Sequence, residues 1–324
     1  MQRWNDLGQI PPDFGPCVVT LGNFDGVHRG HRYVLQSVLE QASRRGVPSV
    51  AVTFDPHPLE VLFPDRAPQH LTSLDQRLAL IEAVGLDAVL VQPFTTDLAK
   101  LTPREYVELV FVGALRAELV VVGQDTRFGV KNSGDVHTLA ELGAEHGFEV
   151  IALDDLGEGR RWSSTMVREQ LLAGRVDQAA SILGRPHRVS GTVVHGFHRG
   201  RELGYPTANL GHDSDGLVPD DGVYAGWFLR LDLPEGAPDR VLPAAISVGT
   251  NPTFEGTRRT VEAYVLDRTD LDLYGEHVAI EFVEHLRPTL KFDSIEALLE
   301  VMADDVERTR SVLTTIVPEH VTGQ

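Results

Sequence analysis

A glycine-rich segment carries two histidines, His28 and His31, in the string Gly22-Asn23-Phe24-Asp25-Gly26-Val27-His28-Arg29-Gly30-His31. The string follows an apolar run and precedes a helical pattern. At such a helix start, backbone N–H groups and the helix dipole favour a phosphate group. The two imidazoles could donate hydrogen bonds to oxygens that gain charge as a pyrophosphate leaves. Taken alone, H-x-G-H is about equally consistent with a glycine-rich turn that carries two surface histidines.

Hydroxyl and guanidinium groups recur further along the first half, in Ser163-Ser164-Thr165-Met166-Val167-Arg168, with Arg161 just before them. Hydroxyls at the start of a predicted helix, with Arg168 one turn later, could bind a triphosphate. By itself, such a string is more often a simple helix cap.

An extended segment in the second half places Thr207 and Asn209 two residues apart, so their side chains point to the same side. The hydroxyl and amide oxygens could both reach one Mg²⁺, which keeps waters and takes further ligands from ATP. The alternative is an ordinary turn before a strand.

Glu262 is the candidate general base. In the string Val261-Glu262-Ala263-Tyr264-Val265, apolar and polar residues alternate, so Glu262 and Tyr264 share one strand face. Phosphorylation of an alcohol calls for a group that takes the hydroxyl proton, whereas an acceptor that is already an ionised phosphate does not. An exposed strand glutamate is otherwise usually just solvated.

The elements that must position these groups fall into two halves. The first half alternates apolar runs with amphipathic stretches, which predicts a parallel sheet covered by helices and ligands bound at the carboxyl ends of its strands. The predicted strands are Val18 to Leu21, Ser49 to Phe54, Ala88 to Val91, Leu119 to Val122 and Glu149 to Leu153. The helix after the first strand should pack on the sheet through Val34, Leu35, Val38, Leu39 and Ala42.

A domain boundary is predicted at Gly184-Arg185-Pro186, because glycine and then proline are expected after a helix, here Val176 to Leu183. The predicted domains are therefore residues 1–184 and 185–324. Short alternating segments between Gly, Pro and Asp residues predict that the second domain is a small antiparallel barrel. An amphipathic helix from about Ser294 should follow, with one apolar face: Ile295, Leu298, Leu299, Met302 and Val306.

Composition limits the partners. The formal net charge of -18 argues against nucleic acid or an anionic membrane as the main partner.

The single cysteine, Cys17, fits a reducing compartment and is expected to be a core residue. Because no run approaches the ~18 apolar residues that span a bilayer, we expect a cytoplasmic protein. No P-loop or G-x-G-x-x-G string occurs, so a kinase here must be of another kind.

Strings throughout the chain resemble one family. The H-x-G-H segment and Ser163 to Arg168 look like signatures of the nucleotidylyltransferase superfamily. The other first-half strings resemble the FMN adenylyltransferase domain of bacterial bifunctional riboflavin kinase/FAD synthetases: Thr53 to Pro58, Leu71 to Ser73, Pro93 to Thr95, Gly123 to Gly129 and Ala180 to Pro186. The second half resembles riboflavin kinase in Gly191 to Leu210, Ser247 to Phe254, Glu262, Asp272 to Gly275, Leu286 to Pro288, Lys291-Phe292 and Asp305.

The resemblance implies that the second domain converts riboflavin to FMN and the first converts FMN to FAD, with ATP, Mg²⁺ and no nucleic acid or membrane partner. The implied catalytic residues are Glu262, His28 and His31, and Thr207 and Asn209 would hold the metal. The implied ATP-binding residues are Gly22, Asn23, Phe24, His28, His31, Arg161, Ser164, Thr165, Arg168, Gly196, Arg199, Gly200, Arg201, Thr207 and Asn209. The implied flavin-binding residues are Phe54, Pro56, Pro58, Phe63, Tyr106, Asp125, Phe128 and Arg287.

Two alternatives stay open. Thr126 stands where the family usually has Phe, so the first domain could have lost effective flavin handling and left a monofunctional riboflavin kinase. Loop-borne Phe63, Tyr106 and Phe128 could stack on the isoalloxazine ring, although any one aromatic is more often part of a core. The chain could also be a non-catalytic flavin carrier, which the two histidines and Glu262 disfavour.

Overall fold

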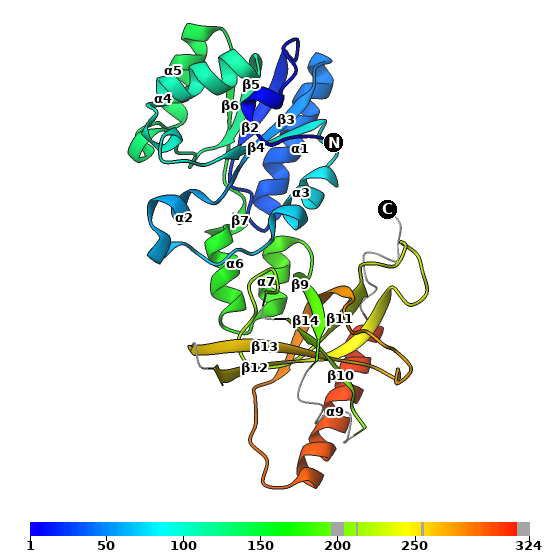
Figure 1. Ribbon diagram of the computed structural model, residues 1–324. Coiled ribbons are helices and arrows are strands. Elements are labelled where there is room, and N and C mark those ends of the chain that lie inside the picture. Colours follow the sequence, from blue (N-terminus) through cyan, green and yellow to red (C-terminus); the bar gives the residue numbers. More distant parts are fainter. Residues whose placement is uncertain (196–203, 212, 254–255, 316–324) are drawn as a thin grey trace. The chain divides into compact units, whose positions relative to one another are not determined.

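The structure is a computed structural model that describes residues 1–195, 204–211, 213–253 and 256–315 (Figure 1). The chain divides into two compact units. The first comprises Met1–Gln69 and Ser73–Ser163, and the second comprises His70–Thr72 and Ser164–Gln324. The two helices that precede residue 185 thus group with the second unit, and the functional domain limits of 1–184 and 185–324 stay a prediction.

The first unit is built on a parallel six-stranded sheet in the order β1-β4-β3-β2-β5-β6. Its strands are β1 (Gln2–Trp4), β2 (Cys17–Leu21), β3 (Ser49–Asp55), β4 (Ala88–Pro93), β5 (Ala117–Gly123) and β6 (Glu149–Leu153). All five predicted strands are present. The edge strand β1 was not predicted, because three residues are too few to show an alternating pattern.

Helices and short turns connect these strands. They are η1 (Leu7–Gln9), α1 (Arg29–Arg45), α2 (Pro58–Leu62), η2 (Pro64–Arg66), α3 (Leu74–Glu82), η3 (Leu98–Lys100), α4 (Pro103–Tyr106), the π-helical η4 (Val107–Ala114), η5 (Val130–Asn132) and α5 (Val136–His146). A small antiparallel hairpin of β7 (Gly157–Glu158) and β8 (Arg160–Arg161) ends the unit. Helix α1 ends at Gly46, whose φ of +69° suits glycine.

Apolar side chains cover both faces of the sheet. On one face, Val18, Leu119 and Val121 pack with Val38 and Ala42 of α1. Leu35 of α1 is also buried, whereas Val34 and Leu39 are half-buried, so the predicted helix face is confirmed. The other face carries a larger cluster that includes residues of α4, η4 and α5: Tyr106, Val107, Val110, Phe111, Leu139 and Leu142. Cys17 is fully buried in β2, as predicted, and burial raises the pKa of its thiol to about 12.

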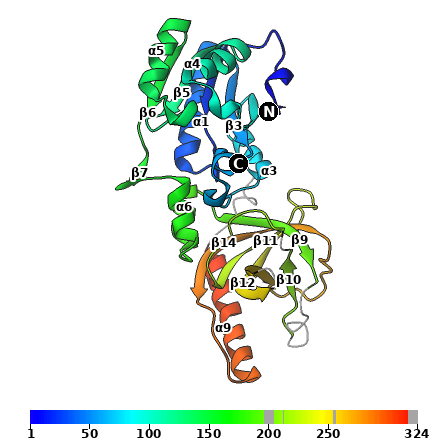
Figure 2. The same cartoon turned by 60° about the vertical axis from the view of Figure 1, so that its left-hand side comes forward.

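The second unit contains a closed barrel in the order β10-β13-β12-β11-β14-β9, with every neighbouring pair antiparallel (Figure 2). Its strands are β9 (His187–Val194), β10 (Thr207–Leu210), β11 (Gly222–Arg230), β12 (Val241–Thr253), β13 (Gly256–Val265) and β14 (His277–Arg287). The fold class predicted from the sequence is therefore confirmed: a parallel α/β sheet and an antiparallel β-barrel with a terminal helix.

Within the described part of the barrel unit, the helices are α6 (Ser164–Leu171), α7 (Val176–Leu183) and the terminal α9 (Ile295–Thr314). The predicted helix bounds at Val176 and Leu183 are confirmed, and Ser294 is the N-cap of α9, where it accepts a hydrogen bond from Ala297 N–H. Helix α9 packs against β11, β12 and β14.

The predicted apolar face of α9 was only partly right. Ile295 is 58% exposed, and the buried side chains are Asp305, Thr309 and Leu313. Leu298, Leu299, Met302 and Val306 are half-buried. Hydrophobic periodicity could not find this face, because two of its buried residues are polar and one of them, Asp305, is a carboxylate paired with Arg287.

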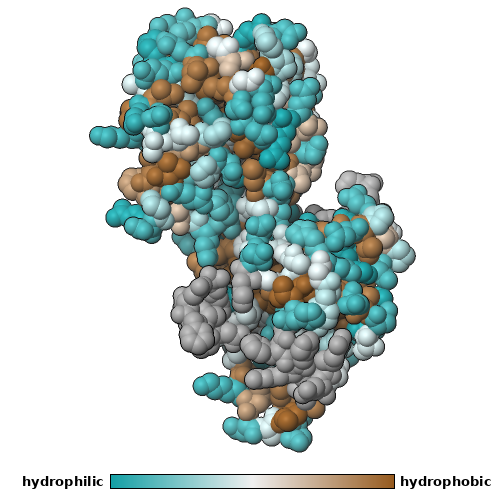
Figure 3. All heavy atoms as spheres, in the orientation of Figure 1, coloured by the Kyte–Doolittle hydropathy of each residue, from teal (hydrophilic) through white to brown (hydrophobic). Residues whose placement is uncertain are grey.

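Hydrophilic side chains are interspersed with hydrophobic ones on the face that Figure 3 shows. Among the described residues, no helix is both long enough and apolar enough to cross a membrane.

Candidate functional sites

His28 and His31 meet at the start of α1, directly after the carboxyl end of β2. His28 is the N-cap residue, and its Nδ1 accepts a hydrogen bond from the His31 backbone N–H at 3.3 Å. The two imidazole rings stack with centroids 3.7 Å apart, and the edge of Phe24 lies against His31 at 5.3 Å. Because Nδ1 of His28 is an acceptor here, the proton of its neutral ring belongs on Nε2, which is then a donor.

His31 is held neutral. Burial lowers the pKa of its imidazole well below the usual value, and the nearby His28 and Arg161 lower it further. A neutral imidazole still offers one N–H donor to a phosphate oxygen. The pair therefore supplies directed hydrogen bonds rather than a cluster of fixed positive charge.

The backbone between β2 and α1 is tightly bent. Phe24 and Val27 have φ values of 49° and 37°, in the left-handed region that residues with side chains rarely adopt. A Cβ atom at Gly30 would lie 3.1 Å from the His28 ring, and one at Gly22 would lie 3.0 Å from the Phe24 ring. Glycine at these two positions thus lets the aromatic rings pack against the main chain.

A buried arginine, Arg77 of α3, lies beneath this loop and was missed from the sequence. Its Nη1 donates to the backbone oxygens of Asn23 at 2.9 Å and Phe54 at 3.0 Å. The side-chain nitrogen Nδ2 of Asn23 lies 3.2 Å from the ring nitrogen Nε2 of His57. The sequence did offer one signal for a buried arginine: Arg77 lies on the same helix face as the apolar residues Leu78 and Ile81.

Arg161 pairs with Asp125, and Asp155 Oδ1 lies 3.5 Å from its Nη1. The structure thus joins a residue predicted to bind ATP with one predicted to bind flavin. Arg29 places its guanidinium carbon 4.4 Å from the centre of the Trp162 ring, a cation–π contact that was not predicted. The other predicted triphosphate ligands, Ser164, Thr165 and Arg168, begin α6 in the second unit.

The predicted flavin-binding aromatics differ in exposure. Phe63 is 53% exposed after α2, whereas Tyr106 and Phe128 are buried. Tyr106 is therefore not loop-borne: it ends α4, packs in the core, and donates its hydroxyl to Gln92 Oε1 at 3.1 Å. Phe54 is half-buried and meets Phe94 edge-on at 5.4 Å. Pro56 is exposed and Pro58 half-buried. The flavin contacts of these residues stay predictions.

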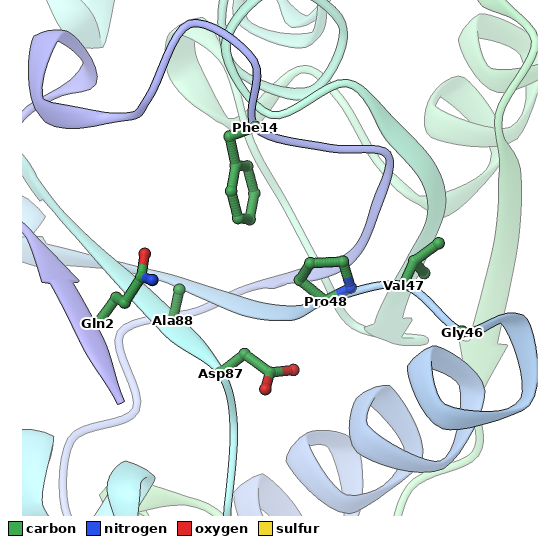
Figure 4. A pocket seen from close by; sticks show the side chains of 7 residues that line it. All are labelled: Gln2, Phe14, Gly46, Val47, Pro48, Asp87 and Ala88. Carbon is green, nitrogen blue, oxygen red and sulfur yellow. The ribbon is translucent and has the colours of Figure 1, made fainter.

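A separate hollow of about 410 Å³ lies at the amino ends of β3 and β4 (Figure 4). It is lined by Gln2, Phe14, Gly46, Val47, Pro48, Asp87 and Ala88. Because the strands are parallel, this hollow is at the edge of the sheet opposite the histidines, and none of the predicted site residues lines it.

In the barrel, Thr207, Asn209 and Glu262 are brought together by strand register. Asn209 of β10 pairs directly with Glu262 of β13, and Thr207 pairs with Tyr264. The Thr207 hydroxyl donates to Glu262 Oε2 at 3.3 Å, and Asn209 Nδ2 lies 3.4 Å from the same hydroxyl oxygen. The predicted alternation is confirmed, since Glu262 and Tyr264 are half-buried between buried neighbours.

This cluster offers oxygen donors. A hydroxyl, an amide and a carboxylate within hydrogen-bonding distance suit a hard cation such as Mg²⁺, which avoids nitrogen and sulfur ligands. No group of three or more His, Cys, Asp or Glu side chains able to hold a metal occurs among the described residues. The predicted ATP-binding residues Gly196, Arg199, Gly200 and Arg201 lie outside the described residues.

Arg287, predicted to bind flavin, makes a partly buried ion pair with Asp305. Its Nη2 lies 2.7 Å from Asp305 Oδ2, and its Nε donates to Asp305 Oδ1 at 2.9 Å. The pair joins the end of β14 to α9. The guanidinium carbon of Arg287 also lies 5.9 Å from the centre of the Phe292 ring. The flavin contact of Arg287 stays a prediction.

Comparison with known families defines the class. A family model described as FAD synthetase matches residues 10–166, and one described as Riboflavin kinase matches residues 183–313. The parallel unit with its H-x-G-H helix start and the barrel with its P-T-A-N strand are therefore the two parts of a transferase, one a nucleotidyltransferase and the other a kinase. Transfers of both kinds from ATP imply a divalent metal.

Full-length relatives identify the family. The bifunctional riboflavin kinase/FMN adenylyltransferase of Escherichia coli (strain K12) is 38% identical over 93% of each chain. The protein of that name from Pseudomonas fluorescens is 37% identical over 96% of this chain and 98% of its own. The chain belongs to the family of bifunctional riboflavin kinase/FMN adenylyltransferases. A crystal structure described as a macrolide-efflux protein from Streptococcus pneumoniae is 30% identical, with a TM-score of 0.84 over 95% of this chain and 98% of that one.

Proposed function

We propose that the barrel phosphorylates riboflavin to FMN and that the α/β unit transfers AMP from a second ATP to FMN, giving FAD and pyrophosphate. Membership in the family and the order of the two matched domains support both steps. The observation that carries the kinase assignment is the contact of Glu262 with Thr207 and Asn209 on adjacent strands.

In the kinase step, Glu262 takes the proton from the ribityl hydroxyl as that oxygen attacks the γ-phosphorus of ATP, and ADP leaves. A carboxylate on a regular strand is well placed for this role, because the paired strands fix its position. Thr207 and Asn209 would hold Mg²⁺, which when bound neutralises charge on the ATP phosphates. The hydrogen bond from Thr207 keeps the Glu262 carboxylate oriented toward the same point.

In the adenylyl step, the FMN phosphate attacks the α-phosphorus of ATP, and no enzymic base is needed because the nucleophile is already ionised. His28 and His31 donate hydrogen bonds to the phosphates as charge moves to the departing pyrophosphate. The backbone from Gly22 to Phe24 and the start of α1 bind the polyphosphate. From the family resemblance, Arg161, Ser164, Thr165 and Arg168 are also proposed to bind the phosphates of ATP.

The remaining assignments follow the family resemblance. Phe54, Pro56, Pro58, Phe63, Tyr106, Asp125, Phe128 and Arg287 are proposed to contact flavin. The metal in both steps is proposed to be Mg²⁺, since an oxygen donor set that borrows phosphate ligands suits that ion. A cytoplasmic location is proposed from the single cysteine and the chain's composition.

A time course tests the proposal directly. The purified protein is incubated with riboflavin, ATP and magnesium, and the flavins are separated by chromatography. FMN should appear first and FAD later. FMN without FAD would leave a monofunctional kinase, and Thr126→Phe would then test whether the missing aromatic is the cause. Tight flavin binding without ATP consumption would favour the carrier.

A further inference from the structure

We infer that Arg77 is a positioning residue for adenylyl transfer, which fixes the loop that carries the histidine pair. The inference rests on the proposed function of the first unit. Arg77 is 2% exposed, and its guanidinium bridges the loop after β2 and the end of the neighbouring strand β3. It contacts neither histidine in the structure, so its effect must pass through the backbone.

The first contact of Arg77 is with the histidine loop. Nη1 donates to the Asn23 backbone oxygen at 2.9 Å, and the Thr53 hydroxyl donates to that same oxygen at 3.1 Å. Asn23 is followed at once by Phe24, which has the left-handed φ of 49°. Left-handed backbone at a residue with a side chain costs about 1–3 kcal/mol and persists only where surrounding bonds hold it. The two donors to Asn23 hold the loop at the start of this bend.

The second contact is with the end of β3. The same Nη1 donates to the Phe54 backbone oxygen at 3.0 Å, and Nη2 lies 3.7 Å from Asp55 Oδ1. One planar guanidinium therefore spans the loop after β2 and the end of β3. Phe54 is a proposed flavin contact, so Arg77 ties the proposed acceptor side of the site to its ATP side.

The charge of Arg77 is compensated locally. Burial lowers the pKa of the guanidinium, and the carboxylates of Asp25, Asp55 and Glu60 raise it in part. A buried cation with several fixed acceptors holds its neighbours in one geometry, since a shifted loop would leave the charge without partners. The fork of an arginine suits this task better than the single ammonium of a lysine.

The test compares substitutions of Arg77 in the full-length protein. Arg77→Met and Arg77→Gln remove the charge, and Arg77→Lys keeps it. Arg104→Met is the matched control, because Arg104 forms a surface ion pair with Glu145 in the same unit. For each variant, kcat and KM for FAD formation from supplied FMN are measured, together with the thermal unfolding of the protein. The kinase kcat of each sample serves as an internal reference for active protein.

We expect a neutral variant that folds to lose about 100-fold in kcat for FAD formation, since small displacements of catalytic groups have effects of that size. The loss should persist in kcat at saturating ATP, while Arg77→Lys should recover at least about a tenth of the wild-type kcat. Kinase activity and the Arg104→Met variant should match wild type.

Two results would overturn the inference. In the first, a folded neutral variant keeps the wild-type kcat. In the second, neither neutral variant folds, so that Arg77 acts through stability alone. A wild-type protein that makes no FAD from FMN would instead count against the proposed function. Failure of the inference about Arg77 can thus be told apart from failure of the proposed function.

Discussion

The two proposed sites meet opposite chemical demands with different kinds of backbone. The kinase site lies on regular antiparallel strands, where register alone sets Glu262 beside Asn209. The adenylyl-transfer site lies on an irregular loop and a helix start, where two non-glycine residues adopt left-handed φ values. The proposed kinase reaction needs a base, and its candidate is a carboxylate on a paired strand. The proposed adenylyl transfer needs only charge stabilisation, and its candidate groups are backbone N–H groups and imidazoles.

The surroundings of the key side chains also differ between the two sites. His31 is held neutral by burial and by its basic neighbours. Glu262, in contrast, is only half-buried and receives a hydrogen bond from Thr207. The comparison predicts that the two activities can be removed one at a time.

The largest effect is expected for Glu262→Gln. Loss of the general base should lower kcat for FMN formation by about 100- to 10,000-fold, because the amide cannot accept the ribityl proton. Formation of FAD from supplied FMN should be unchanged. Steady-state rates of both reactions check this, with Glu284→Gln, an exposed glutamate on β14, as the control. Equal losses in both activities in a folded variant would contradict separate sites.

The next effect concerns the stability of the barrel unit. Asp305→Ala leaves the partly buried Arg287 guanidinium without its carboxylate and should cost about 3 kcal/mol in free energy of unfolding, the lower end of the range for buried pairs. The matched control is Arg310→Met on the same helix, because its ion pair with Asp267 is exposed to solvent and should add little stability. Denaturant unfolding monitored together with kinase activity measures both. A similar small cost for the two variants would show that the Arg287–Asp305 pair adds no net stability.

His31→Ala should block the second reaction alone. Removal of one donor to the developing charge should lower kcat for FAD formation by about 100- to 1,000-fold. The protein should then convert riboflavin to FMN and accumulate it. Chromatography of the flavins checks the result, and His137→Ala, an exposed histidine on α5, is the control. Unchanged FAD output would remove His31 from the mechanism.

The smallest effect is a pH dependence of stability. The folded pKa of His31 lies well below the unfolded value of about 6.5, so below pH 6.5 the unfolded chain binds the extra proton. The α/β unit should therefore be most stable above pH 6.5 and lose up to about 1.4 kcal/mol per pH unit below it. His31→Asn should flatten this decline, whereas His137→Asn should not. Unfolding free energies between pH 5 and 8 measure the difference, and parallel curves for wild type and His31→Asn would reject it.

The sequence predicted most of the fold because its signals were local. Apolar runs predicted the five strands β2 to β6, and the alternation around Glu262 predicted which side chains of β13 are buried. The Gly-Arg-Pro string gave the end of α7. Short or polar elements left no such signal. The edge strand β1 and the buried face of α9 were missed because one has three residues and the other depends on an ion pair.

Within the sites, the sequence by itself determined which chemical groups are available: two histidines at a helix start, and a hydroxyl, an amide and a carboxylate on strands. Only the tertiary structure decided which of them meet. Glu262 contacts Thr207 across 55 residues of sequence because β10 and β13 pair, and Arg77 reaches the Asn23 carbonyl across 54 residues because α3 lies beside the ends of β2 and β3. Periodicity reports which side of an element is buried, but contacts between distant segments depend on strand pairing and packing, which no local pattern encodes.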